Sequence, residues 1–395
     1  MTVKQRNRFA FLTVLALTSA FLNAQSLKKE TIDTKAFSDG VNHWYHIKDE
    51  NNLVNPVPNQ PQYAEENYTQ IADNIILFQR ANGGWPKNYD MKAILTPDQV
   101  KSVVDSKAIL HTTFDNATTY THIYYLAQVY TATKKEKYKE ACLKGIQFVL
   151  DAQYANGGWP QYFPLEKKNY SSHITFNDGA YMGIMDLLDK IVNGNSNFAF
   201  IDAKMKTKVT QAYNKGLDCI LNMQIKDKGV LTAWCQQHDE ETLAPAWARK
   251  FEPPSICNDE SAGVVLFLMK IKNPNERIIQ SIQLAVKWFA DSKIYNTRIE
   301  SFAIKAFESK YTTVKSDRRV VMDTTAPPIW TRYYELGTHR PLFSDRNSEL
   351  LYSLAEVGVE RRSGYSWYTY SPQKVLDKYS DWQKKYAPTA NVLQP

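Results

Sequence analysis

The sequence contains only four cysteines, at positions 142, 219, 235 and 257. None of them forms a C-x-x-C pair or lies at a spacing from histidine that is typical of a zinc site. Cys142 and Cys219 fall among apolar residues of helical spacing, so we expect them to be buried thiols. One disulfide stays open as an alternative, because the N-terminal segment described below predicts an oxidising compartment.

Several catalytic signatures are also absent. The sequence has no G-x-S-x-G, no G-x-x-x-x-G-K-[ST], no G-x-G-x-x-G after a predicted strand, and no H-E-x-x-H. These absences argue against a serine hydrolase of the nucleophile-elbow type, a P-loop nucleotide hydrolase, a dinucleotide-binding enzyme and a zinc metalloprotease.

Only one long hydrophobic run is present, at Phe9–Leu22 (FAFLTVLALTSAFL). It follows Lys4, Arg6 and Arg8 and ends shortly before Ala24, which is the pattern of a secretory signal peptide cleaved near Ala24. The run is too short to span a membrane. We therefore expect the first 24 residues to be removed and the protein to be exported, to the periplasm or the extracellular space, with no membrane partner.

The remaining composition is that of a soluble globular protein, with 43% hydrophobic and 23% charged residues. The formal net charge falls from +7 to +4 without the signal segment, because that segment carries three cations and no acid. A weakly basic exported protein suits an anionic partner. Aromatic residues reach 13%, an enrichment that suits either stacking on a ligand or filling of the core. We expect a monomer and no nucleic-acid partner.

One hexapeptide, ANGGWP, occurs twice, at residues 81–86 and 155–160. Each copy follows a segment with apolar residues three and four positions apart, residues 68–79 and 138–153, which predicts an amphipathic helix. A divergent third copy at residues 216–224 is followed by Gly229 and Trp234, and a fourth at residues 284–294 keeps only the helix. The repeat length is about 70 residues.

A second set of helices is predicted between these, starting at residues 113–116 (TFDN), 175–178 (TFND) and 258–261 (NDES). Two helices per repeat bury both faces only by stacking on their neighbours. We therefore predict an all-α fold, an incomplete α/α barrel or toroid over residues 66–395 with long loops at one rim. Residues 25–65 are expected to form an N-terminal extension packed on its surface.

Two long loops concentrate polar and aromatic residues, at 231–261 and 330–347. The second loop contains Arg332 and Arg346, whose planar guanidinium groups can bind a carboxylate or sulfate with two hydrogen bonds. A carboxylated or sulfated polymer is therefore a candidate ligand. Structural ion pairs with neighbouring acidic residues are the alternative.

Asp115 and Asp178 are placed at corresponding positions, each at the start of the second helix of its repeat. A toroid would bring both to the same rim, where they could hold calcium or act as an acid and base pair. Capping of the helix N-terminus is the simpler alternative for either one alone.

Together, these motifs resemble the pectate lyases of polysaccharide lyase family ten. The similarity covers about residues 68–367 and rests on long motifs: NGGWPKN, TFDNATT, NGGWPQYFP, ITFNDGA, WCQQHDEETLAPAWARKFEPPS and WTRYYELGTHRPLFSDR. The resemblance implies an α/α toroid and a calcium-assisted anti β-elimination of polygalacturonate that yields 4,5-unsaturated oligogalacturonides. The site residues that it implies are Arg249 as the base, Asp115 and Asp178 as calcium ligands, Arg332 and Arg346 as substrate-carboxylate ligands, and Lys87 and Trp234 as further contacts in the cleft.

Two other functions remain open from the sequence. An inverting glycoside hydrolase on the same fold would use two carboxylates, such as Asp115 and Glu260, but would leave the arginines without a role. A noncatalytic exported protein that binds acidic glycans would have the same cleft without turnover. A terpene cyclase is argued against, because the sequence has no DxDD-type acidic cluster.

Overall fold

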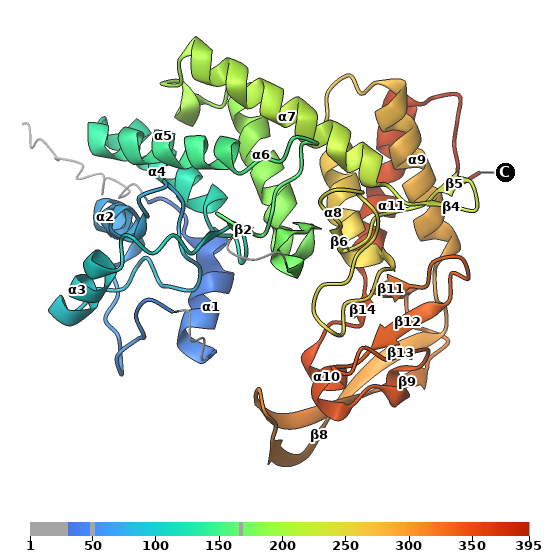
Figure 1. Ribbon diagram of the computed structural model, residues 1–395. Helices are drawn as coiled ribbons and strands as arrows, with labels where there is room; N and C mark the ends of the chain where they lie inside the picture. The colour runs from blue at the N-terminus through green and yellow to red at the C-terminus, as the bar shows by residue number, and fades with distance from the viewer. Residues whose placement is uncertain (1–30, 48–51, 166–168, 395) are drawn as a thin grey trace, which may run out of the picture.

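The computed structural model describes residues 31–47, 52–165 and 169–394 (Figure 1). The predicted signal peptide lies outside the described residues, as do the first residues of the predicted N-terminal extension. Within the described ranges, no helix is both long enough and apolar enough to cross a membrane. All four cysteines are free and buried.

Most of the regular structure is helical. The α-helices are α1 (Ser38–His46), α2 (Tyr68–Phe78), α3 (Pro97–Asp105), α4 (Tyr120–Thr133), α5 (Glu136–Asp151), α6 (Ala180–Val192), α7 (Ala203–Met223), α8 (Asn258–Leu268), α9 (Glu276–Asp291), α10 (Val359–Gly364) and α11 (Ser371–Tyr386). α2, α5 and α8 confirm predicted helices closely, whereas α4 and α6 begin five to seven residues after their predicted starts, and α7 and α9 begin well before the predicted third and fourth copies. The repeats did not predict α1, α3, α10 or α11.

The helices pack in pairs, and the pairs stack in a row. α4 packs against α5, α6 against α7, and α8 against α9. α2 contacts α4, α4 contacts α6, α6 contacts α8, and α8 contacts α11, so each pair covers a face of its neighbour. The row runs across the upper part of the molecule in Figure 1.

A repeated glutamine fastens each repeat to the next. The side-chain amide of Gln79 donates to the carbonyl of Gly83 in its own loop (2.8 Å) and to the carbonyl of Ala141 in α5 (2.9 Å). The same two bonds recur at Gln153, to Gly157 and Ala212, and at Gln224, to Thr232 and Ser281. The divergent third copy therefore keeps the structural role of the first two.

The expected all-α toroid is wrong. The structure is about 45% helix and 15% strand, with several small sheets, and is a mixed α/β fold. Its strands are β1 (Thr112–Thr113), β2 (Tyr162–Phe163), β3 (Ile174–Thr175), β4 (Lys226–Asp227), β5 (Val230–Leu231), β6 (Gln237–His238), β7 (Ile256–Cys257), β8 (Thr297–Glu308), β9 (Thr313–Met322), β10 (Trp330–Thr331), β11 (Tyr333–Tyr334), β12 (Pro341–Ser344), β13 (Leu350–Leu351) and β14 (Tyr368–Thr369).

Part of the error has a physical cause: segments interpreted as loops pair with segments distant in the sequence. The longest strands, β8 and β9, instead form a local hairpin that the helical repeats did not predict. β11 lies between β7 and β12, with Tyr333 opposite both Cys257 and Leu342, so this sheet joins the two long loops that were predicted to be functional. The two-stranded pairs β1–β2 and β3–β6 form in the same way. Strands of two residues carry no alternation that a sequence pattern could reveal.

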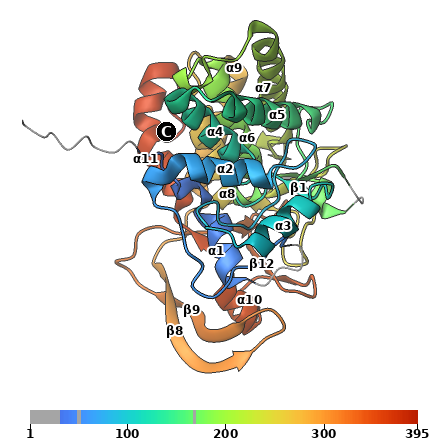
Figure 2. The same cartoon turned by 90° about the vertical axis from the view of Figure 1, so that its left-hand side faces the viewer.

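Beside the helical core lies a second, smaller hydrophobic cluster, formed around Phe251, Tyr333 and Trp367. The long β8–β9 hairpin adjoins this cluster and extends away from the helices (Figure 2). In Figure 1 the N-terminal helix α1 lies on the other side of the molecule from this hairpin, on the same side as α2 and α3. The Trp44 indole donates to the carbonyl of Val54 (2.8 Å), and the Tyr45 hydroxyl donates to Asp90 (3.0 Å).

Candidate active site

An open cleft lies at the starts of α4 and α6. Four of the predicted site residues line it together: Lys87, Asp115, Asp178 and Arg249. The rest of the lining comes from His43, Asn116, Gln161, Tyr162, Tyr170, Thr175, Asn177, Gln237, Ala248 and Glu252.

The two aspartates lie in matching loops but not at matching positions. The backbone N–H of Asp115 donates to Thr113 Oγ1 (3.0 Å), and in the next repeat the N–H of Asn177 donates to Thr175 Oγ1 (3.1 Å). Asp115 therefore corresponds to Asn177. Asp178, with φ 49°, corresponds to Asn116, with φ 50°. The expected equivalence of Asp115 and Asp178 is one residue out of register.

Neither aspartate caps a helix. α4 begins at Tyr120, five residues after Asp115, and α6 begins at Ala180, directly after Gly179. No side chain of Asp115 or Asp178 accepts a hydrogen bond from the first turn of either helix among the contacts of the described residues. The simpler alternative for these carboxylates therefore does not account for their positions.

Asp115 is 4% exposed, and only one of its oxygens has a partner. Oδ2 accepts a hydrogen bond from Lys87 Nζ at 3.0 Å, whereas the buried Oδ1 has no hydrogen-bond partner in the described structure. Burial lowers the pKa of Lys87, but the charge of Asp115 and the phenol of Tyr162 outweigh it, so that the pKa of Lys87 is raised overall. Lys87 is therefore a stable cation in the cleft.

Asp178 is exposed at the open cleft, and the protein atoms packed around it partly desolvate its carboxylate. This desolvation, followed by the nearby charge of Asp115, raises the pKa of Asp178 to about 7, against the opposing effect of Arg249. Two close carboxylates with one unpartnered oxygen form a donor set of the kind that suits a hard cation such as calcium.

Arg249 is fixed by the carboxylate of Glu252, which is 2% exposed. Its Nη2 donates to Glu252 Oε1 at 2.6 Å, and its backbone N–H donates to Oε2 at 3.0 Å. Burial lowers the pKa of Arg249, but the hydrogen bond and charge of Glu252 outweigh it and raise the pKa overall. Glu252 Oε1 also accepts from Gln236 (3.0 Å) and Tyr365 (3.1 Å).

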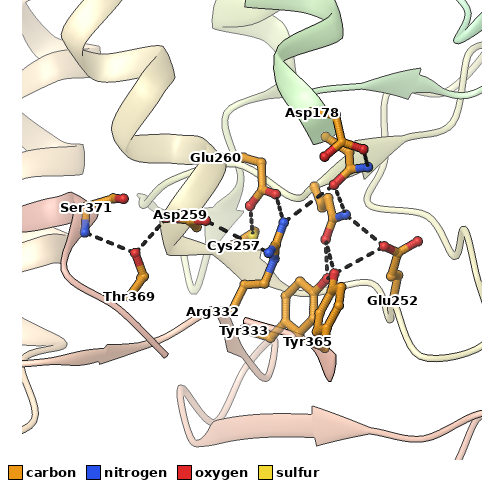
Figure 3. A network of polar contacts seen from close by, with 12 residues as sticks. Asp178, Glu252, Cys257, Asp259, Glu260, Arg332, Tyr333, Tyr365, Thr369 and Ser371 are labelled. Carbon is orange, nitrogen blue, oxygen red and sulfur yellow. Dashed lines mark hydrogen bonds and ion pairs between the residues drawn. The ribbon is translucent and has the colours of Figure 1, made fainter. Parts of the chain in front are cut away.

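Arg332 is not part of the cleft lining. Figure 3 shows its side chain beside Glu260, Tyr333 and Tyr365. Its guanidinium group forms a close ion pair with Glu260 and lies 3.4 Å from Asn177 Oδ1. Asn177 is the neighbour of Asp178 and also accepts a hydrogen bond from Gln236 (2.7 Å). Asn177 Nδ2 in turn donates a hydrogen bond to Asp178 Oδ2, so Arg332 contacts the residue that supports Asp178 and not the open cleft.

Arg346 also lies outside the cleft lining. Its Nε and Nη2 donate to Glu360 (2.8 and 3.0 Å), and the guanidinium carbon lies 3.5 Å from the centre of the Tyr311 ring. The side chain is 31% exposed.

Trp234 is placed in the hydrophobic core, with 0% exposure. Its indole N–H donates to the carbonyl of Ile220 (2.7 Å), as Trp85 does to Ile75 and Trp159 to Val149. It is the tryptophan of the third repeat, and it is not part of the cleft lining.

Comparisons with known proteins identify the family of this chain. The family described as Pectic acid lyase matches residues 79–376. The chain belongs to the pectic acid lyase family. A solved structure of a mutant of the family 10 polysaccharide lyase from Cellvibrio cellulosa, in complex with trigalacturonic acid, is 30% identical, with a TM-score of 0.67 over 80% of this chain and 92% of that chain. A second structure of a family 10 lyase from Cellvibrio cellulosa is 31% identical, with a TM-score of 0.66 over 80% and 91%. No curated protein matches the chain.

This protein is therefore a polysaccharide lyase, and its family and structural relatives support pectate lyase activity. The resemblance seen in the sequence motifs is confirmed. α1 lies outside the residues that match the family, although its His43 lines the cleft. The sequence of this lyase suggested no role for His43, Tyr162 or Glu252. Tyr162 and Glu252 lie within the family motifs quoted above, and this position could have marked them as site candidates. No sequence pattern pointed to His43.

A further group of potential metal ligands, His173, Asp239 and Glu240, has ligand atoms within 4.8 Å of one another. These side chains already bind protein groups. Glu240 accepts from Ser172 Oγ (2.8 Å) and pairs with His173 (2.7 Å), and Asp239 accepts from the backbone and hydroxyl of Thr242 (2.8 and 2.9 Å). We assign this group to the structure of the loop.

Proposed function

We propose that this pectate lyase cleaves polygalacturonate by calcium-assisted anti β-elimination, giving 4,5-unsaturated oligogalacturonides. The observation that carries the proposal is that Lys87, Asp115, Asp178 and Arg249 line one cleft although they come from distant parts of the sequence. One structural relative is in complex with trigalacturonic acid, which supports the choice of substrate.

Asp115 and Asp178 are the residues that would hold calcium. The unpartnered Oδ1 of Asp115 and the mutual repulsion of the two carboxylates fit a divalent cation. When bound, calcium would supply a Lewis acid for the uronate carboxylate next to C5.

The chain's own cations would stabilise the negative charge that spreads into the uronate carboxylate as the C5 proton leaves. Lys87 holds a stable charge in the cleft, and Arg249 faces the same space. We assign Arg249 to removal of the C5 proton, which requires its guanidinium to lose a proton first. Contact with Glu252 opposes that loss, so a substrate or cation that weakens this ion pair would be needed for Arg249 to act as a base.

The two remaining arginines have separate roles in this proposal. Arg346, whose side chain is partly exposed, binds a uronate carboxylate beyond the cleft. Arg332, held by Glu260 beneath Asn177, is a positioning residue for Asp178. Trp234 is left out of the substrate site because it is fully buried.

The hydrolase alternative loses Glu260 as its second carboxylate, but Asp178 still lies with Asp115 in the cleft, so the reaction product must separate the hydrolase from the lyase. Glu260 faces Arg332 and Cys257, with 7% of its side chain exposed, and is not part of the cleft lining. A noncatalytic glycan-binding protein would have the same cleft, so only a test for cleavage of the bound polymer distinguishes it from a lyase.

One assay tests the proposal. Polygalacturonate is incubated with the protein and calcium, or with a chelator, while the ultraviolet absorbance of the unsaturated product is followed. We expect absorbance to rise with calcium and to stay flat with the chelator. Release of reducing ends without absorbance would identify a hydrolase, and retention of polymer with neither signal would identify a binding protein.

We also propose that the protein is exported, on the strength of the hydrophobic run at residues 9–22 and the three cations before it. The N-terminal sequence of the mature protein, purified from culture medium or periplasm, would test the expected cleavage near Ala24. An uncleaved N-terminus would contradict it.

A further inference from the structure

The β8–β9 hairpin is long and has little covering structure. Most residues of both strands are exposed or half-exposed, and β9 packs against α10. The strand register shifts between Ala303 and Phe307, an irregularity of the kind that bends a two-stranded ribbon. Figures 1 and 2 show the curved hairpin at the bottom of the molecule, on the same side as α10 and β12.

The tip of the hairpin contacts Arg346. Tyr311, at the turn between β8 and β9, stacks on the guanidinium of Arg346, whose carbon lies 3.5 Å from the ring centre. Tyr311 nevertheless remains 57% exposed. One face of its ring therefore contacts Arg346, while much of the remaining surface is open to solvent.

A single phenylalanine connects this tip to the cleft. The guanidinium carbons of Arg249, Arg346 and Arg361 lie 5.1, 5.3 and 4.7 Å from the centre of the Phe251 ring. Arg249 lines the cleft and Arg346 contacts Tyr311, so a short line of cations runs from the cleft to the hairpin tip.

Along this line the guanidinium groups outnumber the carboxylates that pair with them, although Asp345 and Glu308 also lie beside it. Glu252 pairs with Arg249, and Glu360 is shared between Arg346 (2.8 Å) and Arg361 (2.8 Å), which leaves two carboxylates for three guanidinium groups. Lys310 adds another cation at the tip, with its Nζ 5.6 Å from the centre of the Tyr311 ring. A polyanion that leaves the cleft would be attracted along this path.

We propose that the hairpin tip is a further sugar subsite for acidic polysaccharide. In this subsite the Tyr311 ring stacks on a sugar ring, and Lys310 binds the carboxylate of that sugar or of its neighbour. A flat aromatic ring with a polar edge offers a large contact area at little conformational cost. The inference rests on the proposed function, because it takes polygalacturonate as the polymer, and it adds a contact beyond the cleft.

The competing explanation is that Tyr311 only fastens the hairpin to Arg346. The two roles differ in what they change. A fastening role would alter thermal stability or protease sensitivity and would affect short and long substrates equally, whereas a distal subsite affects only substrates long enough to reach it.

The test compares Tyr311→Ala and Lys310→Gln with Tyr295→Ala, a control for an exposed tyrosine outside the tip (61% exposed). We expect Tyr311→Ala to lower kcat/KM on polygalacturonate by roughly tenfold, mainly through KM, and to leave trigalacturonate within about twofold. Tyr311→Phe, which keeps the ring, should retain most of the activity on polymer. Equal losses on both substrates, or no loss on polymer, would overturn the subsite.

Direct binding separates this inference from the proposed function. Retardation of each variant in a gel that contains polygalacturonate reports affinity without turnover. A wild-type protein that binds the polymer but never yields unsaturated product contradicts the proposed function alone. Equal retardation of wild type, Tyr311→Ala and Lys310→Gln contradicts the subsite alone.

Discussion

Arg249 Nη2 lies 2.6 Å from Oε1 of Glu252, a carboxylate that is almost completely buried. This ion pair orients the guanidinium group toward its place in the cleft and also holds it in the charged form. The Arg249–Glu252 ion pair therefore favours the position of Arg249 in the cleft but opposes the loss of a proton that Arg249 needs in order to act as a base. Substitutions at the two positions can separate these two effects.

Replacement of Arg249 by alanine should abolish most of the lyase activity. A group that moves a proton in the transition state contributes about 10²–10⁴-fold, so we expect kcat to fall at least about 100-fold in Arg249→Ala, measured by product absorbance. The variant should also lose about 1–3 kcal/mol of stability, because Glu252 is left buried without its partner.

The double variant Arg249→Ala/Glu252→Gln controls for that loss. It removes both charges, so the urea midpoint should recover toward wild type while activity stays low. Activity that returned together with stability would show that Arg249 acts only through the fold.

Asp115→Asn and Asp178→Asn should each weaken calcium binding. Loss of one carboxylate removes an anionic ligand, and we expect the calcium concentration for half-maximal activity to rise at least about tenfold. Titration calorimetry with calcium measures the same change without substrate. Asp381→Asn, an exposed position on α11, is the matched control and should behave as wild type. Unchanged calcium binding in both cleft variants would exclude them as ligands.

The raised pKa of Asp178 predicts a pH-dependent stability. Its pKa is about 7 in the folded protein against an ordinary value of 3.8, so the folded state binds the proton more tightly than the unfolded chain does. The stabilising contribution of this group is therefore complete below about pH 4 and is lost as the pH rises through about 7. In the presence of a chelator, the stability of wild type relative to Asp178→Asn should fall between about pH 4 and pH 7 in urea titrations and level off above about pH 7. A difference that stayed constant or rose over this range would contradict the raised pKa.

Two helical glycines should respond to alanine in opposite directions. A Cβ atom at Gly145 in α5 would lie 2.6 Å from Ile123 Cγ1 and 2.8 Å from Trp85 Cζ3, whereas one at Gly263 in α8 would meet no atom within 4 Å. We expect Gly145→Ala to cost about 1–3 kcal/mol through overpacking and Gly263→Ala to gain up to about 1 kcal/mol from helix propensity. Urea unfolding measures both, and a stable Gly145→Ala would show that the Trp85 ring can move.

Much of the helical framework could be predicted from the sequence. Helices bury one face at a fixed period, so the apolar spacing around ANGGWP located α2 and α5, and the third copy kept Gln224 and Trp234 in their repeated roles. The long motifs also placed the chain in its family, and they contain the four residues that the cleft brings together.

Other features depend on contacts between distant segments. The pairing of Arg332 with Glu260 and the strand joining Tyr333 to Cys257 connect residues more than 70 positions apart. The hairpin could have been recognised from its β-branched residues and their partial alternation, but nothing local showed that Tyr311 would return to Arg346.

The sequence by itself determined the repeating helices, the family and the residue types of the site, since each depends on local periodicity or on contiguous motifs. Only the tertiary structure decided that the fold is mixed α/β, that α1 brings His43 to the cleft, and which arginines face open space. Burial, ion pairing and strand pairing are properties of neighbours in space, and these neighbours are brought together only by folding.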